Sequence, residues 1–102
     1  MSKWVYFGSE CRLLYVRDRA LGVPGLHRPP RGAIHTLAEH GDNAPVSRKP
    51  VKGCSPMRQL TTGGYRTFYY IADNTVVVLH VCKKQDQKHG IQLAYRRMKE
   101  LR

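Results

Sequence analysis

Two apolar runs separated by two polar residues lie in residues 65–84 (YRTFYYIADNTVVVLHVCKK), and they predict a β-hairpin. Tyr65–Ala72 and residues 75–82 are rich in β-branched and aromatic side chains, which fit a pleated, half-buried surface. Asp73 and Asn74 lie between them, and both side chains can bond local backbone and tolerate positive φ. The pattern therefore predicts two strands joined by a tight turn, with the basic pair Lys83 and Lys84 at the end of the second strand.

The length of the turn decides which side chains share a face of this hairpin. A turn of two or four residues predicts three cross-strand pairs on one face: Phe68 with Leu79, Tyr70 with Val77, and Arg66 with Val81. Lys83 is two positions from Val81 and would share its face, so Arg66 and Lys83 would converge at the open end of the hairpin. His80 would point to the other face. A turn of three residues would reverse these pairings.

The flanking segments predict shorter elements. Residues 3–7 (KWVYF) and 57–61 (MRQLT) are expected to be strands. Ser9 is placed to cap a helix over residues 10–21, although that pattern suits a strand nearly as well. A second short helix is expected at 33–40 (AIHTLAEH). The polar segment 42–53, with two prolines, is expected to be a surface loop.

A C-terminal helix is predicted over residues 89–101. Its apolar stripe consists of Ile91, Ala94, Tyr95, Met98 and Leu101, and four basic residues lie off it: Lys88, Arg96, Arg97 and Lys99. The run of strands between helices indicates a single α+β domain over residues 1–102. We expect an antiparallel-rich sheet of about four strands, two N-terminal helices and a C-terminal helix.

Charge narrows the function classes. Lys and Arg number 18 against 7 Asp and Glu, a net charge of +11, of which residues 51–102 carry +7 (ten basic, three acidic). Such an excess favours an anionic partner, above all a nucleic acid, although a solvated basic surface is an alternative. The few scattered acids argue against a paired-carboxylate or Mg²⁺ site.

Several other site types find no support in the sequence. Cys11, Cys54 and Cys82 are widely spaced and lack a CxxC pair, and the five histidines show no metal-ligand spacing, so no metal or other cofactor is expected. Hydrolase, P-loop and dinucleotide motifs are missing. No signal peptide or membrane span is visible, and a cytoplasmic protein is expected.

A basic and aromatic set remains as the candidate site. It comprises Lys49, Lys52, Arg58, Arg66, Lys83, Lys84 and several tyrosines, Tyr70 among them. Arg and Lys bind phosphate, and a tyrosine ring can stack on an unpaired base. Because RNA carries its own 2′-OH nucleophile, such a set can also stabilise charge on a scissile phosphate without a metal, while a Lys, Tyr or His moves protons. Composition alone leaves binding and catalysis both open.

The sequence also resembles a known family. The run MRQL–TTGGYRTFYYIADNTVVVLHVCKK and the helix IQLAYRRMKEL are similar to RelE/HigB-superfamily toxins of toxin–antitoxin modules, most of all the phage-derived HigB-like branch, over residues 54–101. The matching positions are Tyr65, Arg66, Phe68, Tyr69, Asp73, Leu79, His80, Lys83, Lys84, Ile91, Ala94, Arg97 and Met98. Residues 33–41 and 48–57 resemble the family's preceding helix and loop more faintly.

The resemblance implies a small RelE-like fold and an mRNA interferase that cuts mRNA in the ribosomal A site. It implies an antitoxin partner, often with a helix-turn-helix, so that DNA would be contacted only through the antitoxin. It places Arg66 on the scissile phosphate, with Lys83 and Lys84 serving the same site. Two departures stand out: Thr61 replaces the family's usual arginine, for which Arg58 could substitute, and VPGLHRPPRG interrupts the expected helical hairpin.

Each candidate also has a structural interpretation. Arg66 could form a structural salt bridge, and Lys83 and Lys84 could be solvated residues at the end of a strand. His80 could be a hydrogen-bonded residue within the sheet, although histidine is a side-chain type that often transfers protons in catalysis. Tyr69 and Tyr70 suit a core. The toxin interpretation therefore competes with a catalytically silent relative that only binds RNA or its antitoxin, as Thr61 suggests. A DNA-binding regulator is disfavoured because no helix-turn-helix pattern is present.

Overall fold

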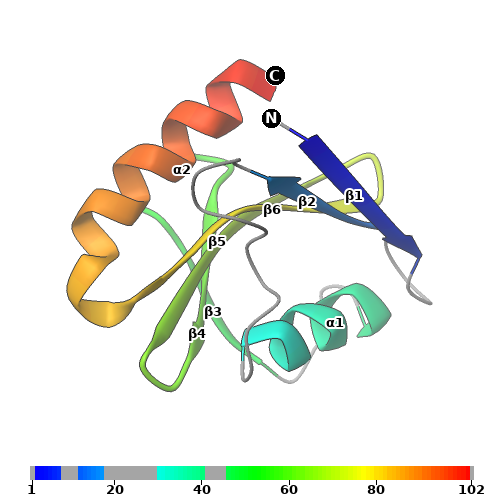
Figure 1. Ribbon diagram of the computed structural model, residues 1–102, viewed down its shortest axis with the longest axis horizontal. Coiled ribbons are helices and arrows are strands. Elements are labelled where there is room, and N and C mark those ends of the chain that lie inside the picture. The colour runs from blue at the N-terminus through cyan, green and yellow to red at the C-terminus, as the bar shows by residue number, and fades with distance from the viewer. Residues whose placement is uncertain (1, 8–11, 18–29, 41–45, 102) are drawn as a thin grey trace.

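The computed structural model describes residues 2–7, 12–17, 30–40 and 46–101. Six strands form one sheet in the order β1-β2-β6-β5-β4-β3, with helices α1 and α2 on opposite faces (Figure 1). In chain order the elements are β1 (Ser2–Phe7), β2 (Arg12–Arg17), α1 (Pro30–His40), β3 (Ser47–Pro50), β4 (Arg58–Thr62), β5 (Tyr65–Ala72), β6 (Thr75–Lys83), the 3₁₀ turn η2 (Lys84–Asp86) and α2 (Gln87–Leu101). The α+β class is therefore confirmed.

The N-terminal part differs from the prediction. Within the helix expected at 10–21, Arg12–Arg17 instead forms strand β2, and the rest of that range lies outside the described residues. Strand β2 pairs antiparallel with β1 and parallel with β6, from Arg12↔Thr75 to Tyr15↔Val78. Pairing with β2 satisfies backbone hydrogen-bonding groups along the edge of β6. A helix at Arg12–Arg17 would leave these groups without a partner strand. The helix expected at 33–40 is present as α1.

Four antiparallel strands, β3 to β6, form the part of the sheet that carries the candidate site. Strand β3 corrects the expected loop at 42–53, because Ser47–Pro50 pairs with β4 at the sheet edge. Three of its four residues are exposed. Polar residues and a proline are tolerated at such an edge, where one side of the strand needs no partner. This is why its composition resembles that of a loop.

The β5–β6 turn is the two-residue turn predicted from Asp73 and Asn74. Their φ angles are 51° and 58°, which is the geometry that matches the twist of the flanking strands. The predicted Tyr70–Val77 pair is confirmed.

Beyond that pair the hairpin register shifts by one residue. Tyr69 pairs with Val78, but Phe68 pairs with His80, so Leu79 is the extra residue of a β-bulge. The predicted Phe68–Leu79 and Arg66–Val81 pairs are therefore wrong. Arg66 pairs with Cys82, and Lys83 pairs with Tyr65.

The bulge changes which side chains meet. His80 shares the face of its partner Phe68, which is the face that α2 covers, instead of pointing away from Arg66 as expected. Arg66 and Lys83 belong to neighbouring cross-strand pairs and hence to opposite faces, so they do not converge on one face. They still lie at the same end of the hairpin.

The sheet packs a core on each face. The α1-face cluster contains Ile34, Leu37, Ala38, Leu60, Tyr69, Val76 and Val78. The α2-face cluster contains Met57, Phe68, Tyr70, Val77, Leu79, Ala94 and Met98, with Ile91, Tyr95 and Leu101 packed against it. The predicted apolar stripe of the last helix is thus confirmed. Arg97, expected off that stripe, is instead only 3% exposed. No helix among the described residues has the length and apolarity of a membrane span.

Candidate nucleic-acid interface

Backbone contacts gather the predicted basic residues at the open end of the β5–β6 hairpin. The Lys84 backbone N–H donates to the Gly64 carbonyl at 2.8 Å, which holds the β4–β5 turn against the end of β6. The Arg66 guanidinium turns back over that turn, because its Nη1 donates to the Gly63 and Tyr65 carbonyls, each at 2.9 Å. Three candidates, Arg66, Lys83 and Lys84, therefore lie in one neighbourhood.

Arg66 is half-buried and has the donors to bind an anion. Within the part of the chain that the structure describes, its hydrogen bonds use only Nη1, and no carboxylate forms a salt bridge with it. The structural salt bridge considered from the sequence is not formed there. Nε and Nη2 can therefore donate to a phosphate in the fork geometry that guanidinium provides.

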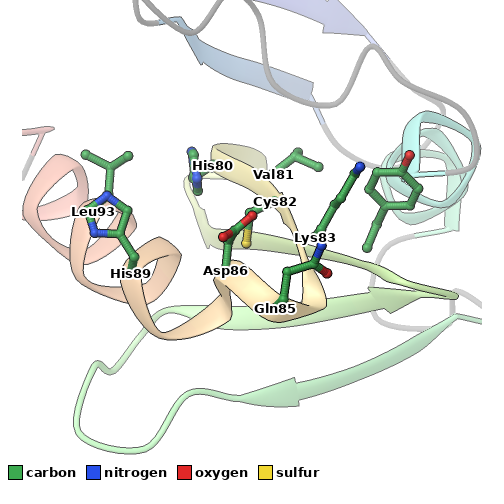
Figure 2. Close-up of a pocket in the computed structure, with 9 residues that line it drawn as sticks. His80, Val81, Cys82, Lys83, Gln85, Asp86, His89 and Leu93 are labelled. Atoms are coloured by element: carbon green, nitrogen blue, oxygen red, sulfur yellow. The ribbon is translucent and has the colours of Figure 1, made fainter.

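A pocket of about 550 Å³ opens beside this end of β6. Its lining comes from Tyr65, from His80, Val81, Cys82 and Lys83 on β6, from Gln85 and Asp86 on η2, and from His89 and Leu93 on α2. Figure 2 shows the Asp86 side chain between His89 and Lys83. The described pairing of β2 with β6 ends at Val78, and the lining residues of β6, His80 to Lys83, lie beyond that point.

Cys82 lies between opposing charges in this pocket. Burial and the Asp86 carboxylate raise the pKa of its thiol to about 11, while Arg66 acts in the opposite direction. At neutral pH the thiol stays protonated, so Cys82 is not a poised nucleophile. Arg66 is the cross-strand partner of Cys82, and Asp86 lines the same pocket as Cys82.

His80 is contacted by Arg97, a buried residue of α2. Arg97 donates through Nη1 to the Leu79 carbonyl at 2.7 Å, and the same nitrogen lies 3.4 Å from His80 Nδ1. The buried guanidinium therefore satisfies the backbone at the bulge and contacts the imidazole beside it. Sequence spacing could have found this residue, because Gly90, Ala94 and Arg97 recur on one helical face.

Lys49, Lys52 and Arg58 lie in a different part of the sheet. Arg58 pairs with Tyr69, three positions from the Thr61–Arg66 pair, which places it roughly 10 Å along the strand. Lys49 pairs with Gln59 next to Arg58, and Lys52 is exposed in the following turn. These three residues belong to the neighbourhood of β3 and the start of β4, away from Arg66.

Arg58 and Thr61 lie on different faces of the sheet. Arg58 is an odd number of positions from Thr61, so it projects to the α1 face, whereas Thr61 shares a face with its direct partner Arg66. The pairing therefore argues against the suggestion that Arg58 substitutes for the arginine that the RelE/HigB resemblance leads us to expect at position 61.

The aromatic candidates belong mainly to the core. Tyr69 is 1% exposed in the α1-face cluster, and Tyr70 is 5% exposed in the α2-face cluster. Little of either ring is open for stacking on a base. Tyr65, in contrast, is half-buried and lines the pocket.

Four pocket residues were missed from the sequence: Gln85, Asp86, His89 and Leu93. They follow the basic pair in a polar segment without a motif, and only the turn η2 brings them back over the end of β6. In the described ranges no three His, Cys, Asp or Glu side chains are grouped to hold a metal ion. Comparison with known proteins gives no match, whether to a model of a protein family, to a curated protein or to a solved structure.

Proposed function

We propose that this chain is the toxin of a toxin–antitoxin module, a metal-independent endoribonuclease of the RelE/HigB type that cleaves mRNA on the ribosome. The observation that carries the proposal is the gathering of Arg66, Lys83 and Lys84 around the Gly64–Lys84 backbone contact. The family resemblance places the phosphate-binding residues at these same positions. A net charge of +11 supports an RNA partner.

The chemistry follows from what these side chains supply. The 2′-OH of the nucleotide before the scissile bond attacks the phosphorus, and the 5′-oxygen of the next nucleotide leaves. Arg66 stabilises the charge that develops on the phosphate oxygens. Lys83 and Lys84, both exposed, position the RNA or ribosomal RNA backbone. His80, which lines the adjoining pocket, is the candidate for moving a proton.

The ribosome supplies what this small site lacks. Holding the mRNA in line for attack contributes a large part of the rate, and the decoding site already orders the codon. The partners proposed are therefore the ribosome, its mRNA and a cognate antitoxin, in the cytoplasm.

A catalytically silent relative is the second candidate. Thr61 directly opposes Arg66, at the position where the resemblance expects an arginine, so the site has one fewer cation on that face. Such a chain would bind RNA or its antitoxin through the same residues without cutting.

Reconstituted translation tests the proposal. Primer extension on an mRNA should show new cleavage sites only when ribosomes, message and this protein are all present. Cleavage of the same message without ribosomes would remove the ribosome-dependent mechanism. Co-sedimentation with ribosomes but no cleavage would favour the silent relative.

A further inference from the structure

The pocket beside β6 combines an apolar wall with a polar rim. Leu93 and Val81 supply apolar surface, while Lys83, Gln85, Asp86 and the imidazoles of His80 and His89 supply polar groups. A volume of about 550 Å³ lies within the roughly 300–1,000 Å³ of sites that hold small ligands. This size and composition suit one planar heterocycle with a charged substituent.

The polar groups have a defined order around the pocket. Lys83 is the cationic lining residue, and Arg66, the cross-strand partner of the lining residue Cys82, lies outside the lining. Asp86 is the anionic lining residue and lies between Lys83 and His89 in the close-up (Figure 2). A ligand with a phosphate at one end and hydrogen-bond donors at the other matches this separation of charge.

The backbone next to Asp86 is fixed by a contact to the sheet. Gln87 Nε2 donates to Gln59 Oε1 at 2.8 Å, and Gln59 is only 3% exposed. On the other side, Lys84 is held by Gly64. The short turn that carries Asp86 is therefore anchored to the sheet on both sides of this residue.

We infer that this pocket binds a single guanine nucleotide, with its phosphate toward Lys83 and its base edge against Asp86. A carboxylate only accepts hydrogen bonds, and guanine presents two adjacent donors, N1–H and the N2 amino group, to a bidentate acceptor. Adenine presents one amino donor beside an acceptor nitrogen, so it makes at most one such bond. His89 and Tyr65 offer aromatic faces for the base.

This inference rests on the proposed function for its biological meaning, because the guanine would be the nucleotide next to the cleaved phosphate. The pocket would then give the site its base preference, and Asp86 would be the residue that determines it. Arg66, Lys83 and Lys84 contact the sugar-phosphate chain and would favour no base.

Direct binding tests the pocket apart from cleavage. The purified protein is titrated with 5′-GMP, AMP, CMP and UMP while amide NMR signals of residues 80–93 are followed. We expect GMP to bind about tenfold more tightly than AMP, the order of discrimination of a bidentate base contact. Asp86→Asn should remove that preference, while Glu100→Gln, which neutralises another exposed carboxylate of this chain, should preserve it. Lys83→Ala should weaken all four nucleotides by a similar factor.

Five outcomes separate the pocket from the nuclease. Guanine preference that depends on Asp86 supports the pocket, even if reconstituted translation shows no cleavage. Equal binding of all four nucleotides, or a preference unchanged in Asp86→Asn, overturns it. Shifts confined to residues outside the pocket also overturn it. Ribosome-dependent cleavage without any nucleotide binding would leave the proposed function standing and remove this inference.

Discussion

Arg97 donates a 2.7 Å hydrogen bond to the carbonyl of Leu79, the extra residue of the β-bulge in β6. The bulge breaks the regular ladder, and α2 supplies the donor that the displaced backbone needs. Because the same bulge turns His80 to the α2 face, the buried arginine connects the packing of the last helix to the geometry of the pocket.

Replacing Arg97 should therefore cost stability. Arg97→Gln shortens the donor and leaves the buried Leu79 carbonyl without its partner, a loss of about 1–3 kcal/mol in the free energy of unfolding. Arg96→Gln is the matched control, since Arg96 is exposed on the same helix and should change stability by about 0.5 kcal/mol or less. Urea denaturation measures both. Equal effects of the two substitutions would contradict the role of the Leu79 contact.

Gly90 should resist substitution although it lies within a helix. A Cβ there would lie 2.8 Å from Cys82 Sγ and 3.0 Å from Phe68 Cε2. Overpacking should cost about 1–3 kcal/mol, against a gain of about 1 kcal/mol in helix propensity, so Gly90→Ala should destabilise by up to about 2 kcal/mol. Gly32→Ala in α1, where a Cβ meets nothing within 4 Å, should instead stabilise. Thermal unfolding of the two variants checks the sign of each effect.

The Cys82 thiol should react only at high pH. In a Cys11→Ser, Cys54→Ser background, its alkylation rate by iodoacetamide should rise with a midpoint at about pH 11, since only the thiolate reacts. A thiol pKa raised above its ordinary value of 9.0 also means that the unfolded chain loses the proton first. The contribution of Cys82 to stability is thus full below pH 9 and declines between pH 9 and 11. An alkylation midpoint near pH 9 would contradict the placement of Cys82 beside Asp86 in a desolvated position.

Thr61→Arg should increase cleavage. The new guanidinium would lie on the face of Arg66, its direct cross-strand partner, and would add a second cation to the phosphate site. Thr61→Gln, similar in length but uncharged, is the control. Single-turnover cleavage on programmed ribosomes should rise about tenfold or more for the arginine variant alone, the effect of roughly 1.4 kcal/mol in transition-state energy. An equal or lower rate would argue that β4 does not border the reacting phosphate.

The sequence identifies the main hairpin because its cues are local. Asp73 and Asn74 predict the turn, and the β-branched and aromatic residues beside them predict both strands. The bulge at Leu79 has no such cue, because VVVLH reads as continuous strand and its stabilising partner Arg97 is 18 residues away. A single extra residue moves every later side chain of the strand to the opposite face, which is why the sequence pattern places His80 on the wrong face.

The same distinction applies to the site. Arg66, Lys83 and Lys84 were found from their motif, and one backbone contact, from Lys84 to Gly64, brings their neighbourhoods together. Asp86 and His89 were missed, because their closeness to β6 depends on how η2 turns the chain. Lys49 and Arg58 were grouped with Arg66 by charge alone, and pairing along β4 separates them.

The central claim is that the open end of the β5–β6 hairpin cleaves ribosome-bound mRNA through Arg66. The most direct measurement is primer extension on one message translated with wild type, Arg66→Ala, or Lys49→Ala, the last removing an exposed cation away from the site. The account predicts ribosome-dependent cuts for wild type and Lys49→Ala, and a loss of about 100-fold or more for Arg66→Ala. Cuts that persist at full strength in Arg66→Ala would contradict it and would move the chemistry away from this end of the sheet.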